Sequence, residues 1–216
     1  MPADADLVQI VDAALAEAAR KSGAWLVCRL GCTECCLGPF PITQLDALRL
    51  RRGLADLEAS DPARGARVRD RARESVARLR PEFPGDPATG VLDENETADE
   101  RFATLAEDEL CPALDPETGA CDLYAARPIT CRSFGPALRH DSQNLGVCEL
   151  CYRGATDEEI AACAVEMDPN RLEDALIEEL EAATGARGQT IVAFALATAT
   201  APRPPAGPPP RGASGR

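Results

Sequence analysis

The chain has 216 residues, and 36 acidic side chains against 23 Lys and Arg give it a formal net charge of -13. This charge disfavours nucleic acid and an anionic membrane surface as partners. No apolar run approaches the roughly 20 residues of a membrane-spanning helix, and the acidic N-terminus lacks the basic segment of an export signal. We therefore expect a cytoplasmic protein with no membrane partner, and the sequence does not indicate which protein partners it has.

Apolar residues at helical spacing recur along most of the chain. Thr43 and Thr156 each stand three residues before an acid, Asp46 and Glu159, which is the pattern of a capping box. Pro62 suits the first turn of a helix. The predicted helices cover residues 6–21, 43–57, 62–79, 98–107, 156–163 and 168–185.

Loops rich in proline and glycine separate these helices and carry most of the cysteines. Residues 115–119 have the composition of a tight turn, so that residues 111–121 could form one short hairpin. We expect a mainly α fold, a small single helical domain over residues 1–200 with irregular cysteine-rich metal-binding loops and a motif core at 24–151. Residues 201–216 are rich in proline and glycine and lack apolar periodicity, which predicts a disordered tail.

Ten arginines lie between residues 49 and 80. Acidic residues alternate with them, and no aromatic residue that could stack on a base stands among them. This pattern favours a solvated helix face with acid–base pairs over a nucleic-acid surface.

Ten cysteines are far above ordinary usage for a chain of this length. Soft thiolates select zinc, copper(I) and iron–sulfur clusters. Thiols stay reduced in the cytoplasm, which favours a metal site over a disulfide scaffold. Nine of the cysteines form closely spaced motifs and are the candidate metal ligands: Cys28, Cys32, Cys35, Cys36, Cys111, Cys121, Cys131, Cys148 and Cys151.

The first four thiols would fall within an arc of about 100° if residues 28–36 were helical. Adjacent residues rarely serve one tetrahedral ion, so Cys35 and Cys36 favour two nearby sites or one multinuclear cluster over a single zinc. Eight thiols would satisfy two four-coordinate sites.

Three stretches carry a family resemblance: Cys28-x3-Cys32-x2-Cys35-Cys36, the segment 111–114 beginning Cys-Pro, and the segment 119–135. Together they resemble the YkgJ-type cysteine-cluster family (CxxxCxxCC), described as a zinc- or iron-chelating domain. The resemblance implies zinc or iron as the cofactor, an iron–sulfur cluster included, held by about eight cysteines. The implied ligands are Cys28, Cys32, Cys35, Cys36, Cys111, Cys121 and Cys131, with either Cys148 or Cys151 as the eighth.

Metal chelation is therefore the predicted function, with the metal ion as partner and with catalytic residues unknown. A flagellin lysine N-methylase has a similar cluster, which implies an iron–sulfur oxidoreductase or a methyltransferase-like enzyme as the alternative. Metal storage or handling is the second alternative, and it predicts labile metal at an exposed thiolate.

Four residues near the motifs have two readings each. Arg127 and Arg132 either offset the charge of the thiolates or pair with surface acids. His140 is either a ligand or a solvated side chain, and its polar neighbours favour the second reading. Cys163 lies among apolar residues of a predicted helix, which favours a small buried hydrophobe over a ligand.

Overall fold

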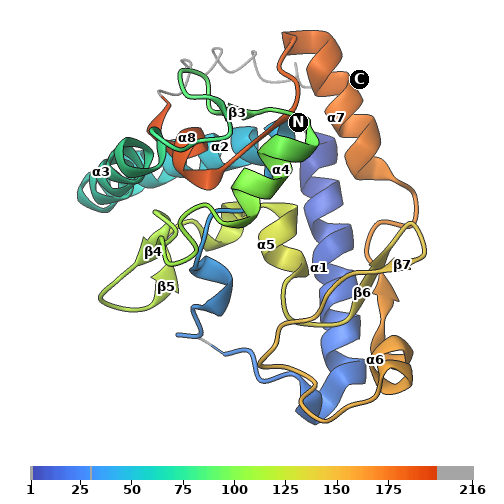
Figure 1. Ribbon diagram of the computed structural model, residues 1–216. Helices are drawn as coiled ribbons and strands as arrows, with labels where there is room; N and C mark the ends of the chain where they lie inside the picture. Colours follow the sequence, from blue (N-terminus) through green and yellow to red (C-terminus); the bar gives the residue numbers. More distant parts are fainter. Residues whose placement is uncertain (1, 30, 199–216) are drawn as a thin grey trace, which may run out of the picture.

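The computed structural model describes residues 2–29 and 31–198. The mainly α fold expected from the sequence is confirmed (Figure 1). In the described residues the α-helices are α1 (Pro2–Ser22), α2 (Gln44–Ser60), α3 (Pro62–Leu79), α4 (Glu96–Ala103), α5 (Ile129–Ser133), α6 (Asp157–Cys163), α7 (Leu172–Thr184) and α8 (Val192–Ala197). Short 3-10 turns are η1 (Gly23–Trp25), η2 (Glu34–Cys36) and η3 (Tyr124–Ala126).

The strands are short and join loops that are distant in the sequence. Antiparallel pairs join β1 (Ile42–Thr43) to β9 (Gln189–Thr190), β2 (Gly85–Asp86) to β3 (Val91–Leu92), and β4 (Leu114–Asp115) to β5 (Ala120–Cys121). A further sheet has β6 (Leu138–His140) between antiparallel β7 (Gln143–Asn144) and parallel β8 (Val165–Glu166). The predicted hairpin is the β4–β5 pair.

Two apolar cores meet at α2. Leu50 and Leu54 pack with α3 and α8, while Leu45 packs with α1, α5 and α7. In Figure 1 the long helix α1 runs the height of the molecule, with α2, α3 and α8 beside its N-terminal end. The short helix α5 lies against α1, so the second core supports the loops that carry the cysteines.

Several predicted helix boundaries differ from the observed ones. The first helix begins at Pro2 rather than residue 6, and the helix predicted over 98–107 is α4, which ends at Ala103. The last predicted helix begins at Leu172 rather than 168, because Arg171 adopts a left-handed conformation with φ 52°. Asp168 still caps it, since its Oδ2 accepts a hydrogen bond from the Glu173 N–H at 2.8 Å.

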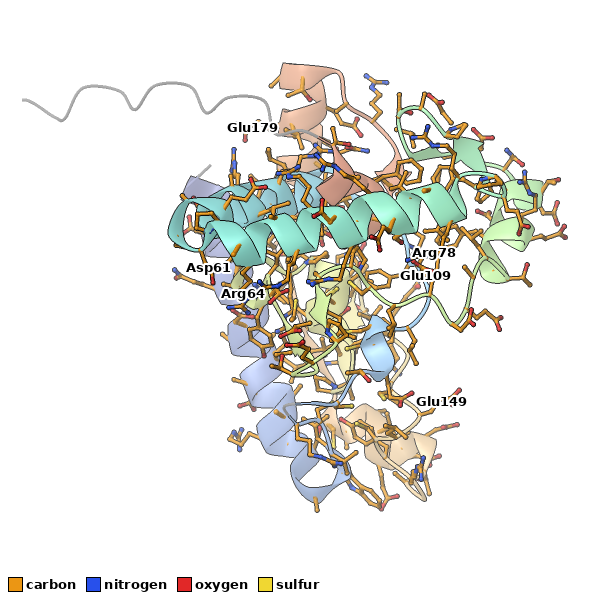
Figure 2. All side chains as sticks on the ribbon, turned by 90° about the vertical axis from the view of Figure 1, so that its left-hand side faces the viewer. Asp61, Arg64, Arg78, Glu109, Glu149 and Glu179 are labelled. Carbon is orange, nitrogen blue, oxygen red and sulfur yellow. The ribbon has the colours of Figure 1, made fainter. Side chains whose placement is uncertain are left out.

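The arginines of α2 and α3 form the predicted acid–base pairs, but several partners come from other parts of the chain. Arg69 pairs with Glu58 across the two helices. Arg78 pairs with Glu109, 31 residues away, and Figure 2 shows the two side by side. The arginine-rich face is therefore held partly by tertiary ion pairs.

In residues 2–29 and 31–198, no helix combines the length and the apolar character needed to cross a bilayer. The tail predicted over residues 201–216 lies outside the described part of the chain.

Candidate metal centre

The cysteine motifs surround one cavity of about 510 Å³. Of the nine candidate ligands, seven line it: Cys28, Cys32, Cys35, Cys36, Cys111, Cys121 and Cys131. Cys151 lies behind this wall, with its Sγ 3.9 Å from the Sγ of Cys28. Segments separated by about 120 residues thus bring their thiols to one place.

The nine thiols divide into two groups by the neighbours that act on them. The first thiol group is Cys28, Cys32, Cys148 and Cys151, because the charges that raise the pKa of Cys28 come from the other three. The second thiol group is Cys35, Cys36, Cys111, Cys121 and Cys131, because the charges of Cys35 and Cys121 add to the rise in the pKa of each of the other three. The CxxxCxxCC motif therefore contributes to both groups, with Cys28 and Cys32 in the first and Cys35 and Cys36 in the second.

Residues 28, 29 and 31–36 form turns and not a regular α-helix, so the four thiols do not share the one face that a helix would give them. The Cys32 N–H bonds the Arg29 carbonyl at 3.0 Å, and Gly31 has φ +85°, which only glycine adopts at little cost. The chain then turns again, with the Cys36 N–H bonding the Thr33 carbonyl at 2.8 Å. The two turns send the first pair of thiols and the last pair to different groups.

Backbone hydrogen bonds join this segment to the next motif. The Cys111 N–H donates to the Cys36 carbonyl at 2.8 Å, and the Gly38 N–H donates to the Glu109 carbonyl at 2.9 Å. In the β4–β5 hairpin, Cys121 pairs with Leu114. Three thiols of the second thiol group are thereby fixed through the backbone.

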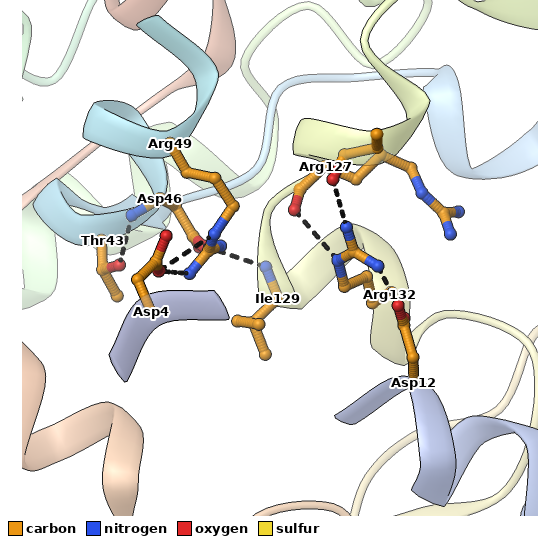
Figure 3. Close-up of polar contacts among 9 residues, drawn as sticks. Asp4, Asp12, Thr43, Asp46, Arg49, Arg127, Ile129 and Arg132 are labelled. Carbon is orange, nitrogen blue, oxygen red and sulfur yellow. Dashed lines mark hydrogen bonds and ion pairs between the residues drawn. The ribbon is translucent and has the colours of Figure 1, made fainter. Parts of the chain in front are cut away.

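Two buried carboxylates anchor the remaining motif residues. The side chain of Asp122 is 2% exposed, and its two carboxylate oxygens form ion pairs with Arg64 and Arg71 at 2.5 Å each. These pairs hold the chain beside Cys121. Asp46, 1% exposed, accepts the Ile129 N–H at 3.0 Å and also bonds Arg49 (Figure 3). Because Ile129 is the first residue of α5, Asp46 sets the entry of the helix that carries Cys131.

Figure 3 also shows how the two arginines of this motif differ. Arg132 is buried and donates to Asp12 at 2.6 Å and to the Ala125 and Arg127 carbonyls. The guanidinium of Arg127 lies 3.8 Å from the ring centroid of Tyr124 and donates to the Tyr124 carbonyl. Both arginines line the cavity, but Arg132 pairs with an acid, whereas the charge of Arg127 acts on Cys35.

Hydrogen bonding and burial shift the thiol pKa values in opposite directions. A hydrogen bond from Cys36 lowers the pKa of Cys35 to about 6, and its own backbone N–H and the charge of Arg127 act in the same direction. Burial raises the pKa of Cys111 to about 12 and also raises that of Cys131. Partial burial and neighbouring thiols raise the pKa of Cys28 to about 12. Cys35 therefore ionises more readily than Cys28, Cys36, Cys111, Cys121 or Cys131, whose pKa values are raised, and a bound cation would displace the protons of these five.

The donor set fits a soft metal by its chemistry and, at one pair, by its distance. A tetrahedral ion with metal–sulfur bonds of about 2.3 Å separates its sulfurs by about 3.8 Å, close to the 3.9 Å between Cys28 and Cys151. Among the described residues, no three His, Cys, Asp or Glu side chains are already close enough to hold an ion. Further thiols must therefore move inward to complete a site.

Two other candidate residues lie apart from the cavity. His140 is half-buried in β6, its Nδ1 is buried without a hydrogen-bond partner in the described chain, and it is not among the residues that line the cavity. Cys163 is buried at the end of α6, and its Sγ donates to the Lys21 carbonyl at 3.5 Å, as expected for a small packed side chain.

Asp46, Asp122 and Asp12 were not identified from the sequence. The capping pattern that begins at Thr43 includes Asp46. That pattern predicts a role for Asp46 at the start of α2, but it does not predict the hydrogen bond to α5. Asp122 stands next to a cysteine, which is the only sequence signal it carries. Asp12 is one of three acids in the helix predicted over residues 6–21, and no pattern distinguishes it from Asp6 and Glu17.

A family model, CxxCxxCC, described as "Putative zinc- or iron-chelating domain", matches residues 27–152. The matched range is more than half of the chain and contains all nine candidate ligands. No curated protein and no solved structure matches the chain.

Proposed function

Since the chain belongs to the CxxCxxCC family of zinc- or iron-chelating domains, we propose that it binds zinc or iron at two neighbouring positions, one in each thiol group. The observation that carries the proposal is the division of nine cysteines around and behind one cavity. Residues 1–200 would form this metal-binding domain, in the cytoplasm, where thiols stay reduced.

The first thiol group suits a closed four-coordinate site. It supplies four sulfurs, which is the complete ligand set of a structural zinc ion, and the separation of Cys28 and Cys151 supports this geometry. Cys148 and Cys151 would then both be ligands of the same ion, instead of alternatives for one position. Such an ion would tie the segment after α1 to the loop before α6.

The second thiol group suits an exchangeable or reactive metal. Its five sulfurs exceed what one tetrahedral ion needs, and they include the adjacent pair Cys35 and Cys36. The depressed pKa of Cys35 supplies a thiolate at neutral pH, which is the form that captures a metal. The neighbouring cavity gives this group access from outside. These features support metal handling at the second position.

An iron–sulfur enzyme is the second candidate function. The cavity of about 510 Å³ beside the second thiol group favours it, because a purely structural ion requires no such space. Bound as a cluster, iron would supply electron transfer or one-electron chemistry.

The test is metal analysis of protein purified without oxygen. Zinc, iron and acid-labile sulfide are measured per chain in the wild type and in Cys151→Ser, Cys131→Ser and Cys163→Ser, together with a visible spectrum. We expect about two ions in the wild type, loss of about one in each of the first two variants, and no change in Cys163→Ser, the matched control. Equal metal content in all four proteins contradicts the ligand assignment.

The same samples separate the two candidate functions. Colourless protein with zinc supports metal handling, and its second ion should exchange with a chelator faster than the first. Iron with matching sulfide and a broad visible band supports the iron–sulfur enzyme.

A further inference from the structure

The cavity wall has a charge opposite to that of the protein as a whole. Acidic residues outnumber Lys and Arg by 36 to 23 in the sequence, yet among the described residues the lining includes Arg29, Arg127 and Arg132 and no Asp or Glu. Carboxylates act on the thiols only from outside this lining, as Glu34 does on Cys35 and Asp122 on Cys121. Asp12 pairs with Arg132, so Arg29 and Arg127 are the two cations of this lining that an external anion or the thiolates could meet.

The three arginines are not equally available. Arg132 is fully engaged, with Asp12 and two backbone carbonyls as partners. Arg127 makes only the hydrogen bond from its Nε to the Tyr124 carbonyl, and no carboxylate of the described chain forms an ion pair with it or with Arg29. Figure 3 shows the guanidinium of Arg127 turned away from the Asp12–Arg132 pair. Arg127 therefore keeps unused donors at the cavity.

An aromatic surface holds this guanidinium in place. Arg127 lies over the ring of Tyr124 at 3.8 Å, and Tyr124 as a residue is 62% exposed. A cation stacked on a ring loses little further side-chain entropy when it binds an anion. Phe134, 47% exposed, lines the same cavity, as does Leu26. A charged anchor and an apolar wall thus face one space.

The space itself is larger than metal ions require. Cavities that bind small molecules have about 300–1,000 Å³ and are mostly apolar with a few placed polar groups, and this cavity has about 510 Å³. Two ions would occupy a small part of it, because even a water molecule takes only about 30 Å³ in the liquid.

We propose that the cavity binds a small organic anion, a carboxylate or a phosphate ester, whose charged group is held by the fork of Arg127 with Arg29 beside it and whose apolar part packs against Phe134 and Leu26. A planar guanidinium matches both kinds of anion by paired hydrogen bonds. The ligand would lie next to the second thiol group, within reach of whatever metal that group binds. The inference does not depend on which metal this is.

The test is titration of the full-length, metal-loaded protein with benzoate, phenyl phosphate and neutral benzyl alcohol by calorimetry. The variants are Arg127→Gln and, as matched control, Arg101→Gln, because Arg101 is an exposed arginine whose hydrogen bond likewise goes only to a backbone carbonyl. Metal per chain is measured on every sample. We expect the wild type and Arg101→Gln to bind one or both anions more tightly than benzyl alcohol, and Arg127→Gln to lose about tenfold or more of this affinity at unchanged metal content. Whichever of the two anions binds more tightly identifies the anionic group.

Three results overturn the proposal. The first is equal anion affinity in Arg127→Gln and Arg101→Gln. The second is benzyl alcohol binding as tightly as both anions. The third is that Arg127→Gln loses metal and that its anion affinity falls in proportion to the metal lost. This result would mean that Arg127 stabilises the thiolates and does not bind the anion. Absence of metal from the wild type would instead contradict the proposed function, and the anion titrations would still decide this inference.

Discussion

Gly53, in the middle of α2, permits the close approach of η3, the turn that joins the hairpin of Cys121 to the helix of Cys131. A Cβ at position 53 would lie 2.3 Å from the Cβ of Ala126, whereas ordinary contact begins at 3.4 Å. Gly53→Ala must therefore push η3 away by about 1 Å. We expect the thiols on both sides of this turn to shift with it.

The magnitude follows from two opposing effects. Overpacking costs about 1–3 kcal/mol, while alanine is favoured over glycine inside a helix by about 1 kcal/mol. The net loss in the free energy of unfolding for Gly53→Ala is then about 0–2 kcal/mol. Removing the opposing methyl group with Ala126→Gly should relieve the clash, so the double variant should be more stable than the sum of the single changes predicts, by about 1–3 kcal/mol.

The assay is urea unfolding of the wild type, both single variants and the double variant at equal metal content, with the rate of metal release to a chelator as the second readout. We expect Gly53→Ala to release metal faster and the double variant to return toward the wild-type rate. Additive unfolding energies and unchanged release rates would refute this account of how α2 positions the cysteines.

Two further predictions concern buried carboxyl groups. Asp46→Ala removes the acceptor of the Ile129 N–H and one partner of Arg49, while Arg49 keeps its pair with Asp4. Urea unfolding should therefore show a loss of about 1–3 kcal/mol, the cost of a buried N–H without an acceptor. Glu17→Ala, in an exposed pair, should leave the midpoint unchanged, and equal midpoints in the two variants would contradict the role of Asp46. Burial raises the pKa of Glu173 from 4.5 to about 7, with Asp46 adding to the effect. The folded state therefore binds this proton more tightly than the unfolded state, and its contribution to stability falls as the pH rises from about 4.5 to 7. Glu173→Gln should remove this dependence of stability on pH and stabilise the protein above pH 7 by at most about 3 kcal/mol. The measurement is the urea midpoint as a function of pH. Identical profiles for variant and wild type would show the prediction to be wrong.

Local sequence patterns were reliable where the interaction itself is local. The capping box at Thr156 and Glu159 forms with both of its hydrogen bonds, and α3 begins at Pro62 as predicted. At Thr43 only half of the box forms, because the Asp46 carboxylate turns to Ile129 and Arg49. A local pattern cannot show that a distant N–H group will compete for the same carboxylate.

The course of the cysteine segment likewise depends on contacts that its spacing does not show. Spacing alone allows a helix over residues 28–36, but the left-handed Gly31 and the hydrogen bond from the Cys111 N–H to the Cys36 carbonyl hold it in turns. The second of these contacts spans 75 positions, and its formation depends on how the hairpin packs. Arg127 and Arg132 had the same two possible roles in the sequence. Only packing decides that Arg132 meets Asp12 while Arg127 stacks on Tyr124.

The sequence by itself determined the chemistry of this protein: a soft-metal donor set, a mainly helical chain and membership of a chelating family, all of which follow from residue types and short spacings. Only the tertiary structure decided which thiols lie near one another, which arginine of the cavity wall pairs with Asp12, and which carboxylates hold the segments that carry Cys121 and Cys131. The physical reason is range. Helix periodicity and thiol softness act within a few residues, whereas Cys28 and Cys151 meet across 123 positions only after the helices have packed.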